Sequence, residues 1–334
     1  MANEQRSNII KNILFLIAAV AITAMAMEIA LRLFYPLYSD YNTEMWRYSS
    51  DMKKLSENRL LSHEHMPNKS GFYYGAEIKT NADGFRDYNY RAEKGSDAYR
   101  ILMLGDSITL GWGVNFSDTF PKMMEKRLNN LSPGKKFEVI NTGVGNYNTQ
   151  MEVELLKAKG LKYKPDLIIL NYYINDAELT KKPNFFAYPL KSGSYLYAFL
   201  WDKISNLILR LSRDNYLVFY SRLYEDSFEG KKIMLQSINE LSSISKERNI
   251  KLLIVAYPEF HNFKNYSFGY VTDTIKNASL SNRVPFLDLL PYYANTSPES
   301  VWVSYEDAHP NALGNSIAAN AVTDFLIKKN LVPS

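Results

Sequence analysis

Three residue types that cooperate in nucleophilic catalysis lie far apart in this sequence. Ser107 ends the stretch ILMLGDS, and Asp307 and His309 lie close to the carboxyl terminus. A serine hydroxyl needs a general base, and an imidazole oriented by a carboxylate commonly supplies it. We therefore expect a nucleophile, a base and an orienting acid. The alternatives are a helix N-cap for Ser107, a packed helix-entry residue for His309 and a turn residue for Asp307.

Two further segments could supply hydrogen-bond donors to a developing oxyanion. The stretch TGVGNYNTQ contains Gly143 and Gly145, whose backbone N–H groups can turn toward a site. The stretch NYYINDAE places Asn175 at the end of an apolar run, where its side-chain amide can donate. Each segment alone reads as a plain turn, but together with the serine and histidine segments they favour a catalytic site.

The elements that must position these residues alternate between short apolar runs and helical stretches. This alternation predicts a parallel five-stranded sheet covered by helices on both faces, with the candidate residues at the carboxyl ends of the strands. The expected strands are 100–106, 137–143, 166–174, 250–258 and 284–290, and the expected helices are 118–130, 149–163, 231–247, 268–280 and 312–329.

Two other segments do not fit this alternation. Residues 37–98 are polar, rich in tyrosine and weakly periodic, and we expect a turn-rich lead-in there instead of a packed helix. Residues 177–230 are too long for one crossover helix, and we expect an insertion near the mouth of the site. A packing helix over 198–212 fits within that insertion.

The amino terminus carries a membrane signal. Residues 13–27 have no charge and follow a leader that contains Arg6 and Lys11. With the apolar residues on either side, the run reaches the roughly 20 residues that span a bilayer. We expect residues 1–36 to be an uncleaved anchor with the remaining chain outside the cytoplasm, and a cleaved signal peptide is the alternative.

The ordered set GDS, GVGNYN, IND and DAHPN resembles the SGNH hydrolase superfamily, the GDSL-type esterases and lipases. NADGFRD and GWGV are similar to the lead-in of its membrane-anchored bacterial members. The resemblance covers roughly residues 80–330 and implies a three-layer α/β/α flavodoxin-like fold. It also implies that Ser107 is the nucleophile, that Asp307 and His309 complete the triad, and that Ser107, Gly145 and Asn175 form the oxyanion hole.

The sequence departs from the family pattern at three positions. Tyr173 stands where the third block has glycine, which would narrow the pocket. Alignment on the following YNT would put Asn146 at the oxyanion position in place of Gly145, and asparagine tolerates a positive φ. The last block has a DxH spacing where many members have DxxH, so Glu306 is a minor alternative to Asp307.

Composition excludes several other classes. The chain has no cysteine and a net charge of +4 spread along its length, so thiolate catalysis and nucleic-acid binding are not expected. His63 and His65 resemble a metal pair but have no third ligand in the sequence, and we expect a solvated loop. For His261 we expect packing or solvent exposure. Serine catalysis of this kind requires no metal and no other cofactor.

We therefore expect a domain at 99–334 that hydrolyses acyl esters, with acetyl or short acyl groups on an envelope glycan or lipid as the substrate. The place expected for it is the periplasmic side of a bacterial inner membrane, with a single membrane helix. One alternative is an O-acyltransferase that modifies an envelope polysaccharide, with a membrane partner that supplies acyl groups. Another is a non-catalytic envelope protein that keeps the fold.

Overall fold

The computed structural model describes residues 2–35, 40–132, 134–180, 193–211 and 216–333. The chain divides into two compact units. One consists of Met1–Ser50 and Asn184–Arg213, and the other consists of Asp51–Pro183 and Asp214–Ser334. The second unit contains the candidate catalytic residues, and we call it the catalytic unit.

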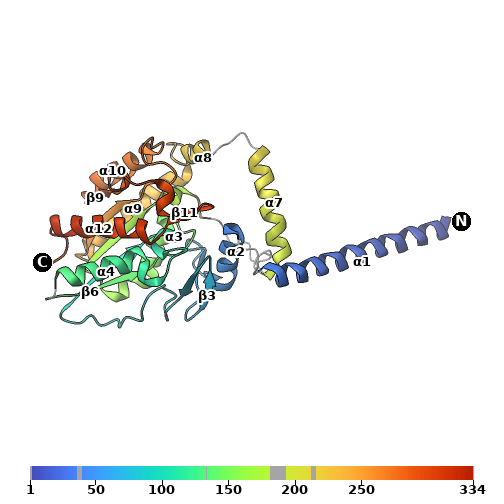
Figure 1. Ribbon diagram of the computed structural model, residues 1–334, viewed down its shortest axis with the longest axis horizontal. Coiled ribbons are helices and arrows are strands. Elements are labelled where there is room, and N and C mark those ends of the chain that lie inside the picture. The colour runs from blue at the N-terminus through green and yellow to red at the C-terminus, as the bar shows by residue number, and fades with distance from the viewer. Residues whose placement is uncertain (1, 36–39, 133, 181–192, 212–215, 334) are drawn as a thin grey trace. The chain divides into compact units, whose positions relative to one another are not determined.

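A parallel five-stranded sheet forms the centre of the catalytic unit (Figure 1). Its strands follow the spatial order β6-β5-β7-β8-β9, which is the flavodoxin-like order. The predicted fold class and all five predicted strands are confirmed. The strands are β5(Ala98–Leu104), β6(Lys136–Asn141), β7(Leu167–Tyr172), β8(Lys251–Ala256) and β9(Phe286–Asp288).

Alternate side chains of these strands are buried on opposite faces of the sheet. Ile101 and Met103 belong to the core that includes side chains of α4(Phe120–Leu131) and α12(Ala312–Lys328). Leu102 and Leu104 belong to the other core, with α5(Thr149–Leu155), α9(Glu229–Glu247) and α10(Gly269–Asn282). This period of two explains why the strands read as continuous apolar runs. Burying each such side chain contributes about 1.5–3 kcal/mol.

The helix predicted over 149–163 changes its winding along its length. It begins as α5, continues as the π-helix η3(Leu156–Gly160) and ends as the 3₁₀ turn η4(Leu161–Tyr163). Gly160 packs closely on the sheet, because a Cβ there would lie 2.9 Å from Cδ2 of Leu102. The shorter elements are α3(Ser107–Leu110), η2(Phe116–Asp118), η5(Ile174–Ala177), α11(Leu290–Tyr293), η6(Pro298–Val301), β10(Trp302–Ser304) and β11(Asp307–Pro310).

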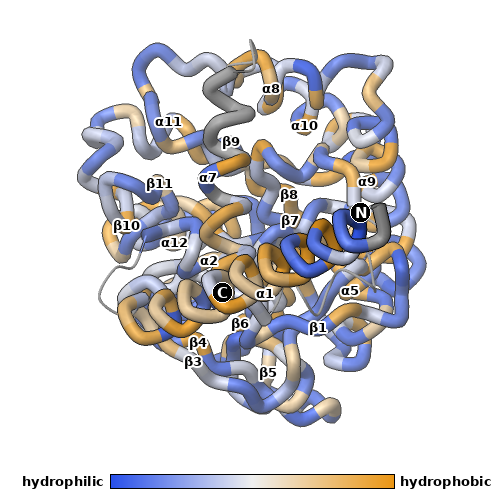
Figure 2. Tube along the Cα trace, turned by 90° about the vertical axis from the view of Figure 1, so that its right-hand side faces the viewer, coloured by the Kyte–Doolittle hydropathy of each residue, from blue (hydrophilic) through white to orange (hydrophobic). Residues whose placement is uncertain are grey.

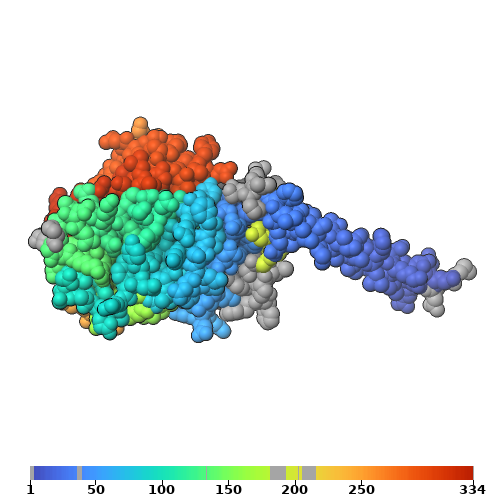
Figure 3. All heavy atoms as spheres, turned by 60° about the horizontal axis from the view of Figure 1, so that its bottom comes forward, coloured from blue at the N-terminus to red at the C-terminus, as the bar shows by residue number. Residues whose placement is uncertain are grey.

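The lead-in segment is more ordered than the sequence predicts. It contains α2(Tyr41–Met52) and two antiparallel pairs, β1(Lys53–Leu55) with β2(His63–His65) and β3(Ser70–Tyr73) with β4(Ala76–Lys79). The expectation of a turn-rich segment without a packed helix was therefore wrong. These strands have three or four residues each, too few for a clear periodicity, and long-range contacts hold them in place. In Figure 3 the lead-in, in light blue, lies directly beside the teal residues that follow β5.

The NADGFRD stretch connects the lead-in to the turn that carries Ser107. The side-chain oxygen of Asn81 accepts hydrogen bonds from the backbone N–H groups of Asp83 and Phe85, both at 2.9 Å. Arg86 is 1% exposed. It donates to four backbone carbonyls, namely those of Glu77, Leu110, Gly111 and Val114 at 2.5–3.1 Å. One side chain therefore satisfies carbonyls at the end of α3 that no helical N–H reaches.

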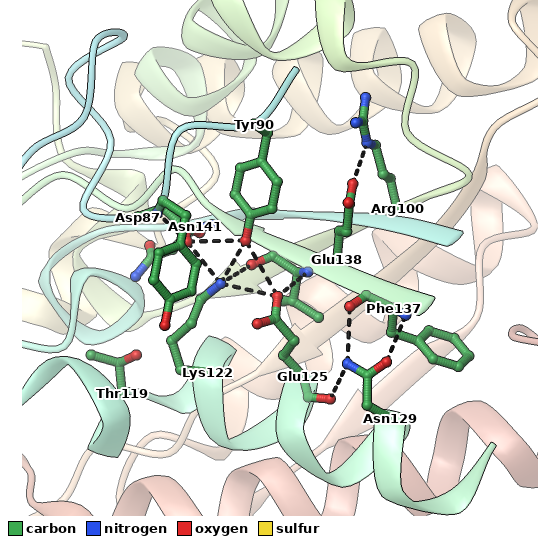
Figure 4. Close-up of polar contacts among 12 residues, drawn as sticks. Asp87, Tyr90, Arg100, Thr119, Lys122, Glu125, Asn129, Phe137, Glu138 and Asn141 are labelled. Atoms are coloured by element: carbon green, nitrogen blue, oxygen red, sulfur yellow. Dashed lines mark hydrogen bonds and ion pairs between the residues drawn. The ribbon is translucent and has the colours of Figure 1, made fainter. Parts of the chain in front are cut away.

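A buried network fixes the end of this stretch to the sheet (Figure 4). Asp87 accepts from the backbone N–H of Asn141 at 2.7 Å and pairs with Lys122 at 2.8 Å. Lys122 also donates to the Tyr90 hydroxyl at 2.9 Å and to Glu125 at 3.0 Å. Burial raises the pKa of Asp87 to about 6. The opposite charges of this network thus stabilise one another where β6 leads into residues 143–146, which we call the GVGN loop.

Replacing Arg86 with methionine is expected to lower the free energy of unfolding by about 3 kcal/mol, because buried carbonyls lose a charged donor. Urea denaturation of the full chain in detergent measures this loss. The exposed Arg91 offers a matched control, since Arg91→Met keeps the change of charge and removes no buried donor. Equal midpoints for the two variants would contradict the structural role of Arg86.

The other unit contains the helices α1(Ala2–Phe34) and α7(Tyr195–Leu211), together with all but the last two residues of α2. Residues Glu4–Phe34 are long and apolar enough to cross a membrane, a property that a signal sequence shares. Figure 2 shows this apolar run in orange. The Glu28 carboxylate accepts from the backbone N–H groups of Tyr195 at 3.1 Å and Leu196 at 2.8 Å, and so caps the first turn of α7.

The predicted insertion contains two helices in its described part. α7 corresponds to the helix expected over 198–212, and α8(Tyr216–Leu223) follows it. Residues 181–192 and 212–215, which belong to the predicted insertion, lie outside the described residues. In α8 the Tyr216 hydroxyl donates to the Glu259 carboxylate at 3.2 Å. At least this carboxyl-terminal part of the insertion therefore packs on the loop after β8.

Candidate active site

Ser107 lies at the first position of α3, directly after β5. Asp106 is the N-cap, and its side chain accepts from the backbone N–H of Ile108 at 2.9 Å. The turn requires glycine at 105, because a Cβ there would lie 2.0 Å from Oγ1 of Thr109. The capping role that the sequence leaves open for Ser107 thus belongs to Asp106, and the serine hydroxyl is available for another partner.

That partner is His309. Oγ of Ser107 lies 2.8 Å from Nε2 of His309, although 202 positions separate the two residues. Nδ1 of His309 lies 2.5 Å from Oδ1 of Asp307. Both residues belong to the strand β11, so the period of two places their side chains on the same face. Glu306, the alternative acid, is exposed to solvent, whereas Asp307 is 3% exposed.

Further hydrogen bonds hold Asp307 in this orientation. Its Oδ1 also accepts from the backbone N–H of His309 at 3.0 Å, and its Oδ2 accepts from the indole N–H of Trp112 at 2.9 Å. Trp112 is 1% exposed and belongs to the GWGV stretch, whose sequence pattern gives the tryptophan no role. Hydrogen bonds to both oxygens stabilise the charged carboxylate.

Charge near His309 makes its imidazole more basic. Burial disfavours the imidazolium, but the negative charge and hydrogen bond of Asp307 and the charge of Asp106 outweigh burial, and the pKa of His309 is raised above 6.5. A stronger base accepts the serine proton more readily. The same two carboxylates stabilise the imidazolium that forms when the proton arrives.

The raised pKa of His309 predicts the pH dependence of catalysis. Only the neutral imidazole accepts a proton, so activity is lost as the pH falls through the pKa of this residue. Because that pKa lies above its ordinary value, we expect the acid limb of log(kcat/KM) to have its midpoint above pH 6.5. Initial rates with a non-ionising ester between about pH 4 and pH 9 measure the midpoint. A midpoint well below pH 6.5 would contradict the role of His309 as the base.

The GVGN loop lies against the turn that carries Ser107. The backbone N–H of Val144 donates to the carbonyl of Gly105 at 3.2 Å. Gly143 packs so closely on α3 that a Cβ would lie 2.3 Å from the backbone nitrogen of Leu110. Gly145 and Asn146 form the tip of this loop, and Asn146 has a φ of 66°. Both alternatives for the backbone oxyanion donor are therefore on one turn beside α3.

Asn175 is also close to the serine. It lies in η5, which follows β7, and its side chain lies near the carboxylate of Asp106, the residue before Ser107. Tyr173, which replaces the glycine of the third block, packs against the cores on both faces of the sheet. The structure thus brings Ser107, Asp307 and His309 into one chain of hydrogen bonds, with Asn175 beside it.

Three buried carboxyl groups lie next to the site, and the sequence pattern assigns a role to none of them. Asp106, Glu152 and Asp176 are each at most 2% exposed. Burial and the charge of Asp106 raise the pKa of Asp176, and burial with the charges of both aspartates raises the pKa of Glu152. Oδ2 of Asp176 accepts from the Thr149 hydroxyl at 3.1 Å. Burial and these neighbouring negative charges therefore disfavour the charged forms of Asp176 and Glu152.

The remaining histidines do not form a metal site. Among the residues that the structure describes, no group of three or more histidine, aspartate or glutamate side chains could hold a metal ion. His63 and His65 belong to β2, and His65 is 2% exposed, so the expectation of a solvated loop was wrong. His261 is largely exposed, as expected, and pairs with Glu259.

Several solved structures of low sequence identity are similar to parts of this chain. No curated protein matches the chain in sequence. Among solved structures, a two-domain esterase active on acetylated mannans is 18% identical with a TM-score of 0.45, covering 69% of this chain and 49% of its own. The chain therefore spans about half the length of that esterase.

Two other solved structures match along nearly their whole lengths. The acetyl xylan esterase AlAXEase is 17% identical with a TM-score of 0.46, covering 68% of this chain and 99% of its own. A lipase/acylhydrolase from Enterococcus faecalis is 14% identical with a TM-score of 0.43, covering 71% and 98%.

The family assignment rests on the sequence itself. Residues 103–317 match the sequence profile of the GDSL-like Lipase/Acylhydrolase family. This range is more than half of the chain. It begins in β5, just before Ser107, and extends past Asp307 and His309 into α12. The chain belongs to the GDSL-like Lipase/Acylhydrolase family, as its resemblance to the GDSL-type esterases and lipases predicts.

Proposed function

We propose that this protein hydrolyses acyl esters through an acyl-enzyme formed on Ser107. The observation that carries the proposal is the continuous hydrogen-bonded path from Oδ1 of Asp307 through the imidazole of His309 to Oγ of Ser107, with steps of 2.5 and 2.8 Å. Both distances are within hydrogen-bond range, so a proton can move from the hydroxyl to the ring without rearrangement.

The proposed reaction has two halves. In the first, His309 takes the hydroxyl proton as Oγ of Ser107 attacks the acyl carbonyl, and the resulting imidazolium then gives that proton to the departing alkoxide. In the second, His309 takes a proton from water, the hydroxide attacks the acyl-enzyme, and the carboxylic acid leaves. Asp307 keeps the ring in the tautomer that presents a lone pair at Nε2 and stabilises the imidazolium in both halves.

The oxyanion of each tetrahedral intermediate needs donors that are already in place. We assign these to the backbone N–H of Ser107, the side-chain amide of Asn175 and a backbone N–H from the tip of the GVGN loop, Gly145 or Asn146. Ser107 is the first residue of α3, so its backbone N–H has no helical acceptor and can donate to a substrate oxygen. Loss of one such donor commonly costs about 10²–10³ in kcat.

The proposed substrate class depends on the compartment to which the amino-terminal helix directs the chain. We propose that α1 is a single-pass anchor in a bacterial inner membrane, with the basic leader at Arg6 and Lys11 on the cytoplasmic side. The catalytic unit is then periplasmic. Acetyl or short acyl esters on an envelope glycan or lipid are the substrates within its reach.

Labelling and turnover test this proposal. The full chain in detergent micelles is treated with a fluorophosphonate probe and mapped by peptide mass spectrometry, with p-nitrophenyl acetate hydrolysis measured in parallel. We expect a single label on Ser107 and release of acetate. Folded protein that takes no label would overturn the hydrolase mechanism and leave the non-catalytic alternative.

The same acyl-enzyme could pass its acyl group to a sugar hydroxyl, because His309 can take a proton from any hydroxyl that reaches Nε2. Acetate release and acetylation of an added polysaccharide are therefore measured together. Hydrolysis predicts that the rate of acetate release is unchanged by the acceptor. Acyl transfer predicts that acetylated polysaccharide accumulates while acetate release falls.

A further inference from the structure

Two side chains of the lead-in bind the tip of the GVGN loop. Nζ of Lys53 donates to the carbonyl oxygen of Gly145 at 2.6 Å, and Nε2 of His63 lies 3.2 Å from the same oxygen. A carbonyl oxygen only accepts, so the His63 ring presents its N–H there. Lys53 and His63 belong to the paired strands β1 and β2, which we call the lead-in hairpin, residues 53–65. Both lie outside the residues 103–317 that match the family.

The carbonyl that they bind belongs to the central peptide of a tight turn. The backbone N–H of Tyr147 donates to the carbonyl of Val144 at 3.1 Å, which closes a four-residue turn. Asn146, the third residue, has a φ of 66°, whereas Gly145 is not among the residues with positive φ. A negative φ followed by a positive φ at the two central residues matches the φ pattern of a type II turn, and asparagine is one of the few residues that tolerate the third position.

The direction of the central peptide distinguishes a type II turn from a type I turn. The two types differ mainly in ψ of the second residue and φ of the third, each by about 150–170°, so the peptide between them turns over while the ends of the turn stay in place. Donors that bind the Gly145 carbonyl stabilise one of the two orientations. In a planar trans peptide the N–H points opposite to the C=O, so the same contacts fix the N–H of Asn146.

We propose that Lys53 and His63 are positioning residues of the oxyanion hole, because they hold the Gly145–Asn146 peptide in the orientation that directs a backbone N–H toward the acyl oxygen on Ser107. The proposal rests on the proposed hydrolase mechanism and adds to it a part of the chain that precedes the family-matched region. Neither residue touches the substrate. Each acts through the backbone of the loop tip.

The lead-in hairpin is itself anchored, so its two donors are fixed in space. The Tyr147 hydroxyl donates to the backbone carbonyl of His63 at 2.6 Å, and the two rings meet edge to face at 5.2 Å. On the neighbouring position, Glu64 pairs with Lys159 at 2.6 Å. Asn58 donates to Glu154 at 2.9 Å. The hairpin is thus bonded to the loop and to the helical segment that follows it.

The burial of Lys53 is costly, which argues against a merely packing side chain. Lys53 is 6% exposed, and burial lowers its pKa to about 7. Lysine is rarely buried this deeply, because the ammonium loses its hydration. Burial also lowers the pKa of His63 well below 6.5, so its ring is neutral and donates from Nε2. A short hydrogen bond from a lysine polarises the Gly145–Asn146 peptide and strengthens its N–H as a donor.

The test compares Lys53→Met and His63→Phe with wild type in the full chain. Each variant keeps much of the side-chain volume and removes one donor. If the orientation of the Gly145–Asn146 peptide matters for the oxyanion, kcat for p-nitrophenyl acetate falls about 10- to 100-fold while KM changes little. Removing an oxyanion donor itself lowers kcat by about 10²–10³, and a positioning residue acts only through such a donor. His63→Gln, whose amide can still donate, is expected to recover part of the loss.

A tetrahedral inhibitor separates positioning from general disruption. An alkyl boronic acid forms an adduct on the serine that places an oxygen in the oxyanion hole, so its inhibition constant should rise by the same factor as kcat falls across the variants. Lys54→Met is the matched control, because Lys54 is the next residue along β1 and its side chain is half exposed. It is expected to leave kcat and boronate affinity unchanged.

The outcomes distinguish this proposal from the hydrolase mechanism itself. An active wild type with Lys53→Met and His63→Phe variants of equal kcat and equal boronate affinity would overturn the positioning role alone. An inactive wild type that takes no fluorophosphonate would overturn both. If Lys53→Met fails to fold, the comparison of His63→Phe with His63→Gln provides the test. If Lys53→Met and His63→Phe both fail to fold, the two side chains have a structural role and the proposal is overturned.

Discussion

Ser107→Ala is expected to lower kcat for ester hydrolysis by about 10⁴ to 10⁶, close to the loss that follows removal of a triad serine or histidine in serine hydrolases. The reason is the loss of the only atom in the hydrogen-bonded path that can form the acyl bond, since Oγ lies 2.8 Å from Nε2 of His309. Hydrolysis of p-nitrophenyl acetate and fluorophosphonate labelling measure the effect together.

The matched control for this substitution is Ser117→Ala. Ser117 is exposed in η2, ten positions further along the chain, and its hydroxyl contacts only the neighbouring Asp118 among the described contacts. The alanine variant at 117 should keep wild-type kcat and labelling. Residual hydrolysis by Ser107→Ala above about one hundredth of wild type would contradict the nucleophilic role, because it exceeds the residual catalysis expected from binding and oxyanion donors.

Asp307→Asn is expected to lower kcat by about 10³ to 10⁴, as in triads whose orienting carboxylate becomes an amide. The carboxylate accepts from Nδ1 of His309 at 2.5 Å, and this bond keeps the Nε2 lone pair directed at the serine. An amide can donate to Nδ1 instead, which favours the tautomer with the proton on Nε2. That tautomer cannot accept the serine proton.

This substitution also changes the pH dependence in a defined direction. The charge and hydrogen bond of Asp307 raise the pKa of His309 against the effect of burial. Without them burial prevails, the pKa falls, and the acid limb of the residual activity should move to lower pH. NMR titration of the imidazole protons gives the same shift independently of turnover.

Glu306→Gln is the control that decides between the two adjacent acids. Glu306 is exposed, so its amide variant should keep both kcat and the position of the acid limb. A larger loss in Glu306→Gln than in Asp307→Asn would contradict the assignment of Asp307 as the orienting acid.

The central sheet could be predicted from the sequence because its strands are buried on both faces. Continuous runs such as 101–104 and 167–170 are completely buried, and short apolar runs between polar segments are typical of strands in a covered parallel sheet. Once the strand order is known, Ser107 and Asn175 must lie at the same edge, since β5 and β7 are parallel neighbours. Asp307 and His309 are two positions apart on β11, so their side chains lie on one face and complete the candidate triad.

The parts that the sequence does not reveal depend on contacts between distant residues. Lys53 binds Gly145 across 92 positions, and Trp112 binds Asp307 across 195. A buried polar side chain has no periodicity of its own, because its environment is made by other segments. Glu152 illustrates this, since it occupies a helical position that would otherwise be apolar. The GWGV and NADGFRD stretches are the nearest signals, and they indicate the family but not the roles of Trp112 and Arg86.

The four carbonyl bonds of Arg86 also bear on domain transplantation between relatives. A graft limited to the family-matched residues 103–317 would leave out this guanidinium and the two donors of the lead-in hairpin. The recipient chain would have to supply equivalents at the same places, or the grafted turn would be left with unsatisfied carbonyls. A graft that begins at Asp51 carries its own supports, so the exchangeable module is longer than the family signature.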